Sequence, residues 1–83
     1  MIKVKQKLPK WFNGELYEKG AIVRNRFSEE EYKLNAIELS LYDFVIGSTI
    51  MCEMGMTEVV PNLRKGLDWF RMNNAEAYMV LLD

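Results

Sequence analysis

Residues 36–54, AIELSLYDFVIGSTIMCEM, form a helix-length run that is apolar on nearly every side. Asp43 is the only charged residue between Leu39 and Cys52. A helix with one apolar stripe lies at a surface, whereas a helix that is apolar all round has to be covered from several directions. A chain of 83 residues has few other segments that can provide this cover. The run therefore predicts a central helix and favours a partner.

The length of the chain limits how such a core can be stabilised. One small domain over residues 1–83 buries only about 60–65% of the surface that its unfolded chain exposes. Disulfides, metals or oligomerisation often stabilise domains of this size. Cys52 is the only cysteine and histidine is absent, so an internal disulfide is excluded and two common metal ligands are nearly missing. We expect no metal or other cofactor, and a homo-oligomer or else a well-packed monomer.

Targeting and membrane segments are not visible in the sequence. The N-terminal lysines are not followed by the apolar stretch of a signal peptide. The longest charge-free apolar run, residues 44–52, is far shorter than the roughly 20 residues that span a bilayer. These features predict a soluble cytoplasmic protein with no membrane partner.

The first 26 residues have the pattern of short strands. The lysines of residues 2–8 alternate with Ile2, Val4, Gln6 and Leu8, which is the period of an edge strand, and Pro9 ends it. Asn13-Gly14 is a typical hairpin turn between residues 11–12 and 16–17. Residues 21–24, AIVR, are strand-like. We expect two to four short antiparallel strands that pack on helices.

The central helix has two possible starts, each with a capping box. One pairs Ser28 with Glu31, and the other pairs Asn35 with Glu38. A start at Ser28 gives a helix of about 26 residues, which is long by ordinary standards. We therefore favour Asn35, with residues 27–34 forming a turn and a short extended stretch or a single helical turn.

The C-terminal part of the sequence predicts one further helix and a short last one. Gly55 is expected to end the central helix and Thr57 to cap the next, with Pro61 in its first turn. Asn74 can cap the last helix, and the apolar residues 78–82 should dock into the core or a neighbouring subunit. The predicted fold class is α+β: a small N-terminal antiparallel sheet or hairpin (1–34) packed on two to three helices (35–83), with a long central helix at about 36–54.

A strip of small residues runs along the central helix at spacings of four, three and four: Ala36, Ser40, Asp43 and Gly47. Such spacing lets a second helix approach closely, so the strip is the candidate interface. A carboxylate in apolar surroundings can also act as an acid or base. No second positioned group accompanies Asp43, so we favour a satisfied polar group, paired with Arg64, Lys65 or a Trp N–H, or exposed at a wet edge.

Catalytic and metal-binding motifs are not found in the sequence. Without histidine, no Ser-His or Cys-His nucleophile can form within one chain. Cys52 lies in an apolar helix beside Glu53, which is typical of a structural cysteine. Residues 29–31 are three glutamates but lack the spacing of a calcium loop. We therefore predict no catalytic, cofactor or metal residues, and a protein that is not an enzyme.

The charge is unevenly distributed. Residues 1–10 carry four lysines and no acid, whereas residues 27–58 carry seven acids against one lysine. This asymmetry suits self-association, or contact of a basic arm with nucleic acid. The isoelectric point near 5.5 argues against nucleic acid, which remains the alternative hypothesis. Its contact residues would be Lys3, Lys5, Lys7, Lys10, Trp11, Arg24 and Arg26.

Three segments carry a resemblance to known proteins. The strings LYEKGAIVRNRFS (16–28), LNAIELSLYDFVIGS (34–48) and KGLDWFRMNNAEAYMVLLD (65–83) are similar to small uncharacterised proteins of marine T4-like tailed bacteriophages. The resemblance implies a phage origin and expression inside a bacterial host, and it implies no functional residue. We expect a small interaction or structural protein that self-associates and presents a surface to a phage or host protein.

Overall fold

The fold consists mainly of a β-hairpin and a pair of packed helices. The computed structural model describes residues 6–12, 14 and 16–82. The strands are β1 (Ala21–Arg24) and β2 (Glu31–Leu34). The helices are α1 (Ala36–Glu53), α2 (Val60–Asn73) and the short α3 (Ala75–Ala77). A 3-10 turn, η1 (Thr57–Val59), precedes α2, and a π-helical turn, η2 (Tyr78–Leu82), follows α3. The predicted α+β class and the order of strands before helices are confirmed.

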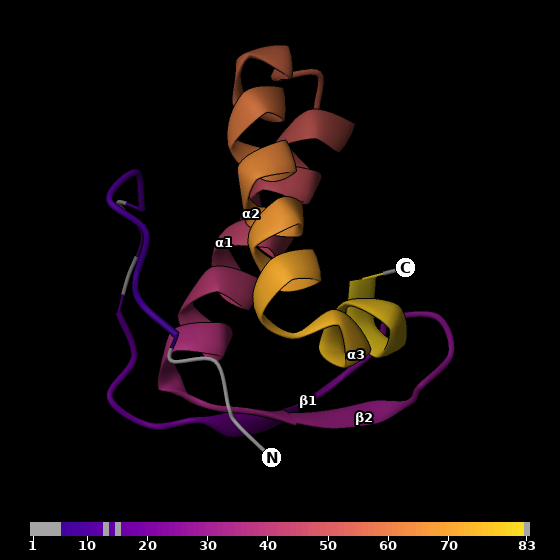
Figure 1. The fold of residues 1–83 in the computed structure, drawn as a ribbon. Helices are drawn as coiled ribbons and strands as arrows, with labels where there is room; N and C mark the ends of the chain where they lie inside the picture. The colour runs from indigo at the N-terminus through magenta and orange to yellow at the C-terminus, as the bar shows by residue number, and fades with distance from the viewer. Residues whose placement is uncertain (1–5, 13, 15, 83) are drawn as a thin grey trace.

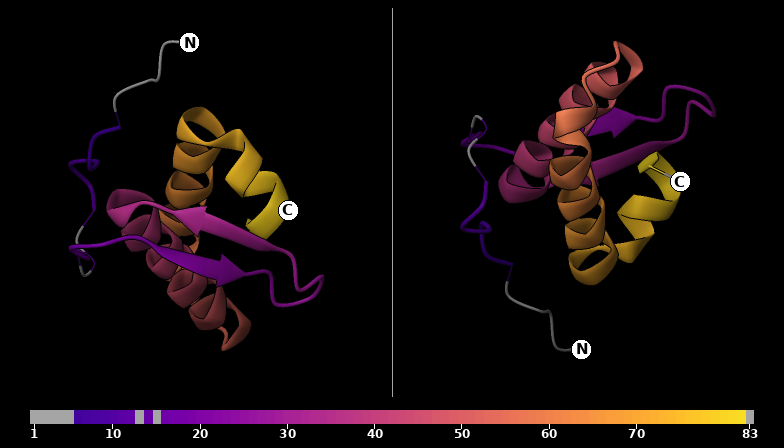
Figure 2. Two further views of the ribbon diagram at one scale, coloured as in Figure 1. Left: turned by 90° about the horizontal axis from the view of Figure 1, so that it is seen from below. Right: turned by 90° about the horizontal axis from the view of Figure 1, so that it is seen from above.

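The elements pack as a hairpin laid across one end of a helical pair. Figure 1 shows α1 and α2 side by side, with the hairpin below them and the C-terminal turns folded onto it. The views from below and above place α3 and η2 beside the hairpin, on the opposite side from the N-terminal segment (Figure 2). The hairpin, both long helices and the C-terminal turns therefore all border one core.

The two strands pair differently from the sequence-based expectation. β1 pairs antiparallel with β2, with Ala21 opposite Leu34 and Arg24 opposite Glu31. The expectation of further strands within residues 1–26 is wrong for residues 6–12, 16 and 17, which are not strands. The predicted edge strand and the predicted first hairpin turn involve residues 1–5 and Asn13, which lie outside the described residues. The partner strand is the short extended stretch that was expected before Asn35.

The start of α1 confirms the second capping box. The Asn35 side chain accepts a hydrogen bond from the Glu38 backbone N–H at 2.8 Å, and the Glu38 side chain accepts one from the Asn35 N–H at 2.9 Å. Ser28 lies in the hairpin loop instead. Met54 is the last capping residue of α1, and Gly55 follows it with a positive φ of 92°. A glycine adopts this conformation without steric strain, so Gly55 ends the helix as expected.

The second helix begins later than expected. Thr57 lies inside η1, and the residue that precedes α2, Val59, makes no side-chain capping bond, so Thr57 is not the cap of α2. Pro61 does lie in the first turn. At the other end, the Asn74 side chain accepts a hydrogen bond from Ala77 N–H at 3.1 Å and caps α3 as predicted.

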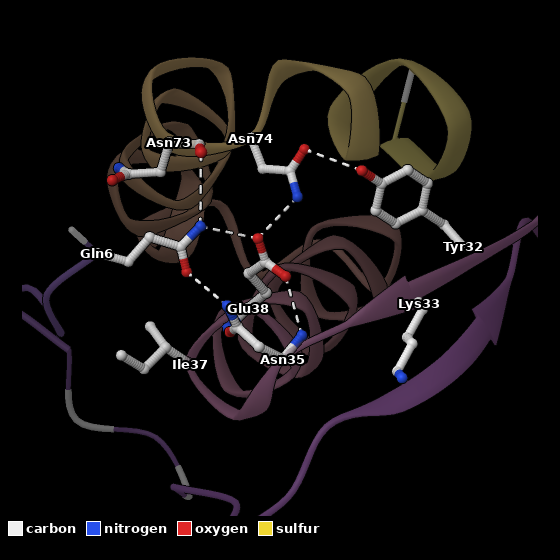
Figure 3. A pocket seen from close by; sticks show the side chains of 8 residues that line it. All are labelled: Gln6, Tyr32, Lys33, Asn35, Ile37, Glu38, Asn73 and Asn74. Carbon is white, nitrogen blue, oxygen red and sulfur yellow. Dashed lines mark hydrogen bonds between the residues drawn. The ribbon is translucent and has the colours of Figure 1, made fainter. Parts of the chain in front are cut away.

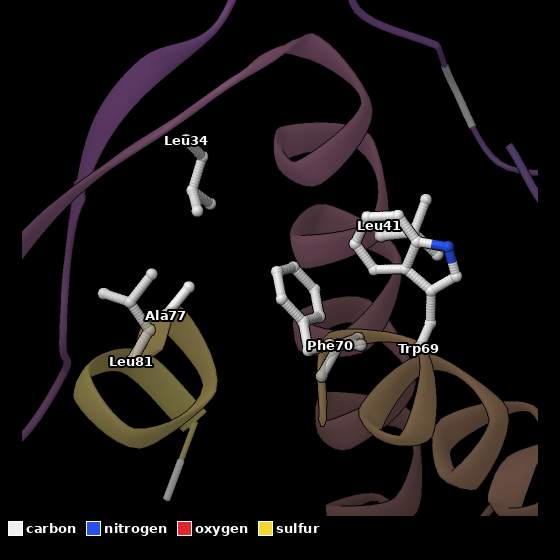
Figure 4. Packing of buried hydrophobic residues seen from close by; sticks show 7 residues of the cluster. Leu34, Leu41, Trp69, Phe70, Ala77 and Leu81 are labelled. Atoms are coloured by element: carbon white, nitrogen blue, oxygen red, sulfur yellow. The ribbon is translucent and has the colours of Figure 1, made fainter. Parts of the chain in front are cut away.

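The core contains side chains from β2, the three helices α1, α2 and α3, and the turn η2. The buried cluster consists of Leu34 of β2, Leu41 and Val45 of α1, Trp69 and Phe70 of α2, Ala77 of α3 and Leu81 of η2. Figure 4 shows the packing of this cluster. The rings of Trp69 and Phe70 meet edge to face, with centroids 5.1 Å apart. Leu81 is only 6% exposed, so the apolar C-terminal segment is docked within the same chain, one of the two expected places.

The close contact between α1 and α2 lies at Gly66, not at the small-residue strip of α1. Gly66 is buried on α2, and a Cβ placed there would lie 2.6 Å from Cγ2 of Val45. A Cβ placed at Gly47 would meet nothing within 4 Å. The small residue that permits the helices to approach is therefore on α2, and Val45 fills the space it leaves.

Alanine substitutions at these two glycines should have opposite effects. Gly66→Ala overpacks the contact with Val45, whose branched side chain has one strongly preferred rotamer in a helix, and we expect a net loss of about 1 kcal/mol or more of unfolding free energy. Gly47→Ala meets no steric barrier and should gain up to about 1 kcal/mol from helix propensity. Urea unfolding followed by circular dichroism measures both. A Gly66→Ala protein as stable as the parent would contradict the close approach.

Candidate interaction surface

The small-residue strip of α1 is divided into a covered half and an open half. Ser40 is buried, donates its hydroxyl to the Ala36 carbonyl at 2.8 Å and accepts the Tyr17 backbone N–H at 2.9 Å. The N-terminal segment therefore covers this half. Asp43 is exposed and Gly47 half-buried, beside a hollow of about 270 Å³. Asp43 thus has the wet-edge position that was one of its expected alternatives.

The basic residues proposed for nucleic acid do not come together on one face of the described structure. Lys3 and Lys5 lie outside the described residues, while Lys7 and Lys10 are exposed on the N-terminal segment. Trp11 packs on Phe44 with ring centroids 5.6 Å apart. Arg24 is the last residue of β1 and pairs with Glu31 at 3.1 Å, and Arg26 lies in the hairpin loop and pairs with Glu53 at 3.7 Å. The hairpin loop and the N-terminal segment lie on opposite sides of the helical pair (Figure 1).

The largest hollow that we describe is a polar pocket of about 600 Å³ around Glu38. Glu38 is only 5% exposed. Besides Asn35 N–H, its carboxylate accepts hydrogen bonds from the side-chain amides of Gln6 at 2.8 Å and Asn74 at 2.7 Å. Figure 3 shows these amides converging on the carboxylate from the N-terminal segment, the start of α1 and the end of α2.

The polar groups of this pocket bind one another and join four segments. The hydroxyl of Tyr32 on β2 donates to the Asn74 side chain at 3.3 Å, and Asn35 donates its amide to Gln6 at 2.8 Å. Burial and then the nearby Glu76 carboxylate raise the pKa of the Tyr32 hydroxyl, which keeps its proton at neutral pH. Among the described residues, no buried side-chain nitrogen or oxygen lacks a partner. We conclude that this network holds the fold together.

A second hollow, of about 200 Å³, is an apolar groove between the hairpin loop, α1, α2 and η2. We call it the apolar groove; its walls come from Val45, Ile46, Thr49, Leu63, Leu67, Leu81 and Leu82. The exposed side chains of Arg26 and Phe27 in the hairpin loop and of Glu53 on α1 lie together at its rim, next to the buried Asn25. Phe27 is 87% exposed, the largest exposed fraction among the large apolar side chains of the described residues.

The loop that carries Phe27 is held by a buried side chain. Asn25 is 7% exposed, and its side-chain oxygen accepts the backbone N–H groups of Phe27 at 2.7 Å and Ser28 at 3.1 Å. Its amide donates to the Val80 carbonyl at 2.8 Å. Glu29, with φ of 64°, adopts the left-handed conformation that completes the turn. The backbone that carries the exposed ring is therefore fixed relative to the groove and to the C-terminal turn.

Sequence reasoning missed both the groove and the role of Phe27. An aromatic residue in so small a chain is expected to be buried, so the exposure of Phe27 was not expected. The available signal was Asn25, because an asparagine before a turn often bonds to backbone groups two residues ahead.

Two further properties concern membrane insertion and metal binding in the described part of the chain. Its helices include none with the length and apolar character of a membrane span, and its acidic and cysteine residues form no group of three that could hold a metal ion. The chain matches no protein-family model, no curated protein and no solved structure. The apolar groove and the exposed Phe27 beside it are therefore the main indication of function.

Proposed function

We propose that this chain is a small non-enzymatic interaction protein that self-associates in the cytoplasm of a bacterial host. The observation that carries the proposal is the exposed Phe27, on a hydrogen-bonded loop beside an open apolar groove. An aromatic ring that stays in water forgoes the favourable free energy of burial, which binding to a partner can supply. A contiguous exposed apolar surface commonly marks an interaction site. The resemblance of residues 16–28, 34–48 and 65–83 to phage proteins supports a phage origin and a phage or host partner.

The nucleic-acid alternative has weaker support. Binding of phosphate backbones depends on cations gathered along one surface. Lys7 and Lys10 lie on the N-terminal segment, whereas Arg24 and Arg26 lie near the hairpin loop and are paired with carboxylates. We therefore favour a protein partner, and a second copy first.

Sedimentation velocity over micromolar to millimolar protein concentrations tests self-association. We expect the mean sedimentation coefficient to rise with concentration and to approach that of an oligomer. A species that stays monomeric over the whole range would contradict the proposal. Nuclease treatment of the sample serves as a control, because an oligomer bridged by nucleic acid would dissociate after it.

A further inference from the structure

We propose that the apolar groove receives Phe27 of a second copy, and that the second copy receives Phe27 of the first in return. This inference rests on the proposed self-association and adds the surface and its geometry. A contact in which the same patch serves both subunits has two-fold symmetry and closes as a dimer. Such a contact requires that the projecting group and its receptor lie together on each chain.

The structure meets this requirement at the hairpin loop. Phe27 stands at the rim of the groove and yet remains 87% exposed, so it does not fill the groove of its own chain. The Asn25 side chain fixes the loop to the backbone of Val80, one residue from the groove residue Leu81. Because the loop backbone is already held in place, little backbone entropy is lost when the ring binds.

The apolar surface extends beyond the groove along α1. Ile46 lines the groove, and Ile50 and Met54 follow it at successive spacings of four residues, which places them in a row on one side of the helix. Ile50 is 44% exposed and Met54 73% exposed. A two-fold contact can bury this row on both subunits. The interface is then larger than a single ring, as a stable dimer needs.

The charges beside the groove favour a second copy over an unrelated apolar partner. Arg26 lies beside Phe27, with its guanidinium 5.3 Å from the ring centroid, and pairs with Glu53 of the same rim at 3.7 Å. One cation and one carboxylate at the same rim make the surface complementary to itself. Two copies facing each other across a two-fold axis can exchange this pair, so that Arg26 of each binds Glu53 of the other in place of its own.

Sedimentation velocity of two matched variants tests the inference. Phe27→Ala removes the projecting ring and should weaken dimerisation at least tenfold, because a buried aromatic side chain at the centre of an interface commonly carries a large share of the binding energy. Met72→Ala removes a side chain that is 81% exposed on α2 and does not line the groove, so its dimerisation should equal that of the parent. Circular dichroism confirms that both variants are folded.

A mixing experiment tests the reciprocal geometry. Ile46→Lys places an ammonium group at the groove and leaves Phe27 intact, so it should also be monomeric alone. Mixed with Phe27→Ala, it should form a heterodimer that keeps one of the two contacts, because its ring enters the intact groove of the other variant. Recovery of part of the dimer in the mixture supports the inference. Two variants that remain monomeric together would overturn the reciprocal contact.

Other outcomes distinguish this inference from the proposed function. A parent protein that dimerises while Phe27→Ala dimerises equally well overturns the groove contact and leaves self-association standing. Loss of the dimer in Gly47→Ala with no effect of Phe27→Ala would assign the interface to the small-residue strip instead. A parent that is monomeric at all concentrations overturns both.

Discussion

Replacing Glu38 by alanine should lower the free energy of unfolding by about 3 kcal/mol, the range expected when hydrogen bonds to a buried charged group are lost. The substitution leaves three N–H donors, from Asn35, Gln6 and Asn74, without their acceptor in a poorly solvated site. The loss also removes the carboxylate that links Gln6 of the N-terminal segment to Asn74 at the junction of α2 and α3. Urea unfolding at neutral pH measures the difference.

Two controls define the cause of this effect. Glu58→Ala removes an exposed carboxylate from η1 and should change stability by no more than about 0.5 kcal/mol. Glu38→Gln keeps the shape but replaces one acceptor oxygen with a donor, so it should fall between the parent and Glu38→Ala. If Glu38→Ala is as stable as Glu58→Ala, the pocket around Glu38 does not hold the fold and is open to a binding role.

Replacing Phe70 by alanine should have the largest effect on stability, a loss of about 3–5 kcal/mol. Phe70 is fully buried in the cluster to which both long helices, the hairpin and the C-terminal turn contribute. Removing the ring leaves a cavity bordered by several elements, none of which can close it alone. Thermal unfolding followed by near-ultraviolet circular dichroism should show a loss of fixed aromatic packing and a much lower midpoint.

Phe27→Ala is the matched control for this substitution, since it removes the same ring from an exposed position. Its effect on the stability of the monomer should be within about 0.5 kcal/mol. Comparison of the two variants therefore separates the effect of core packing, at Phe70, from the effect of an exposed apolar side chain, at Phe27. A large loss in the Phe27→Ala monomer, or a small loss in Phe70→Ala, would contradict the assignment of Phe70 to the core and Phe27 to the surface.

Local sequence signals predicted the helical part of the fold well. The reciprocal bonds of Asn35 and Glu38 start α1 where the capping box indicated, and Asn74 caps α3. Pro61 lies in the first turn of α2. Each of these features depends on residues within one helical turn of each other, so a short stretch of sequence is enough to predict it.

The strands were predicted less well. β1 was expected from its β-branched residues, but its partner proved to be β2, seven or more residues later in the chain. The strip on α1 stays a predicted interface, while the close contact between helices within the chain uses Gly66 of α2. Spacing along one helix shows which residues share a face, but it does not show which neighbour covers that face.

The sequence by itself determined that residues 36–54 form a central helix that needs cover from several sides, with a capped start and a glycine at its end. Only the tertiary structure decided what provides that cover: the N-terminal segment over Ser40, α2 at Gly66 and the C-terminal turn beside the groove. The physical reason is range. Capping bonds form between residues a few positions apart, whereas burial of Glu38 and exposure of Phe27 depend on contacts between segments tens of residues apart.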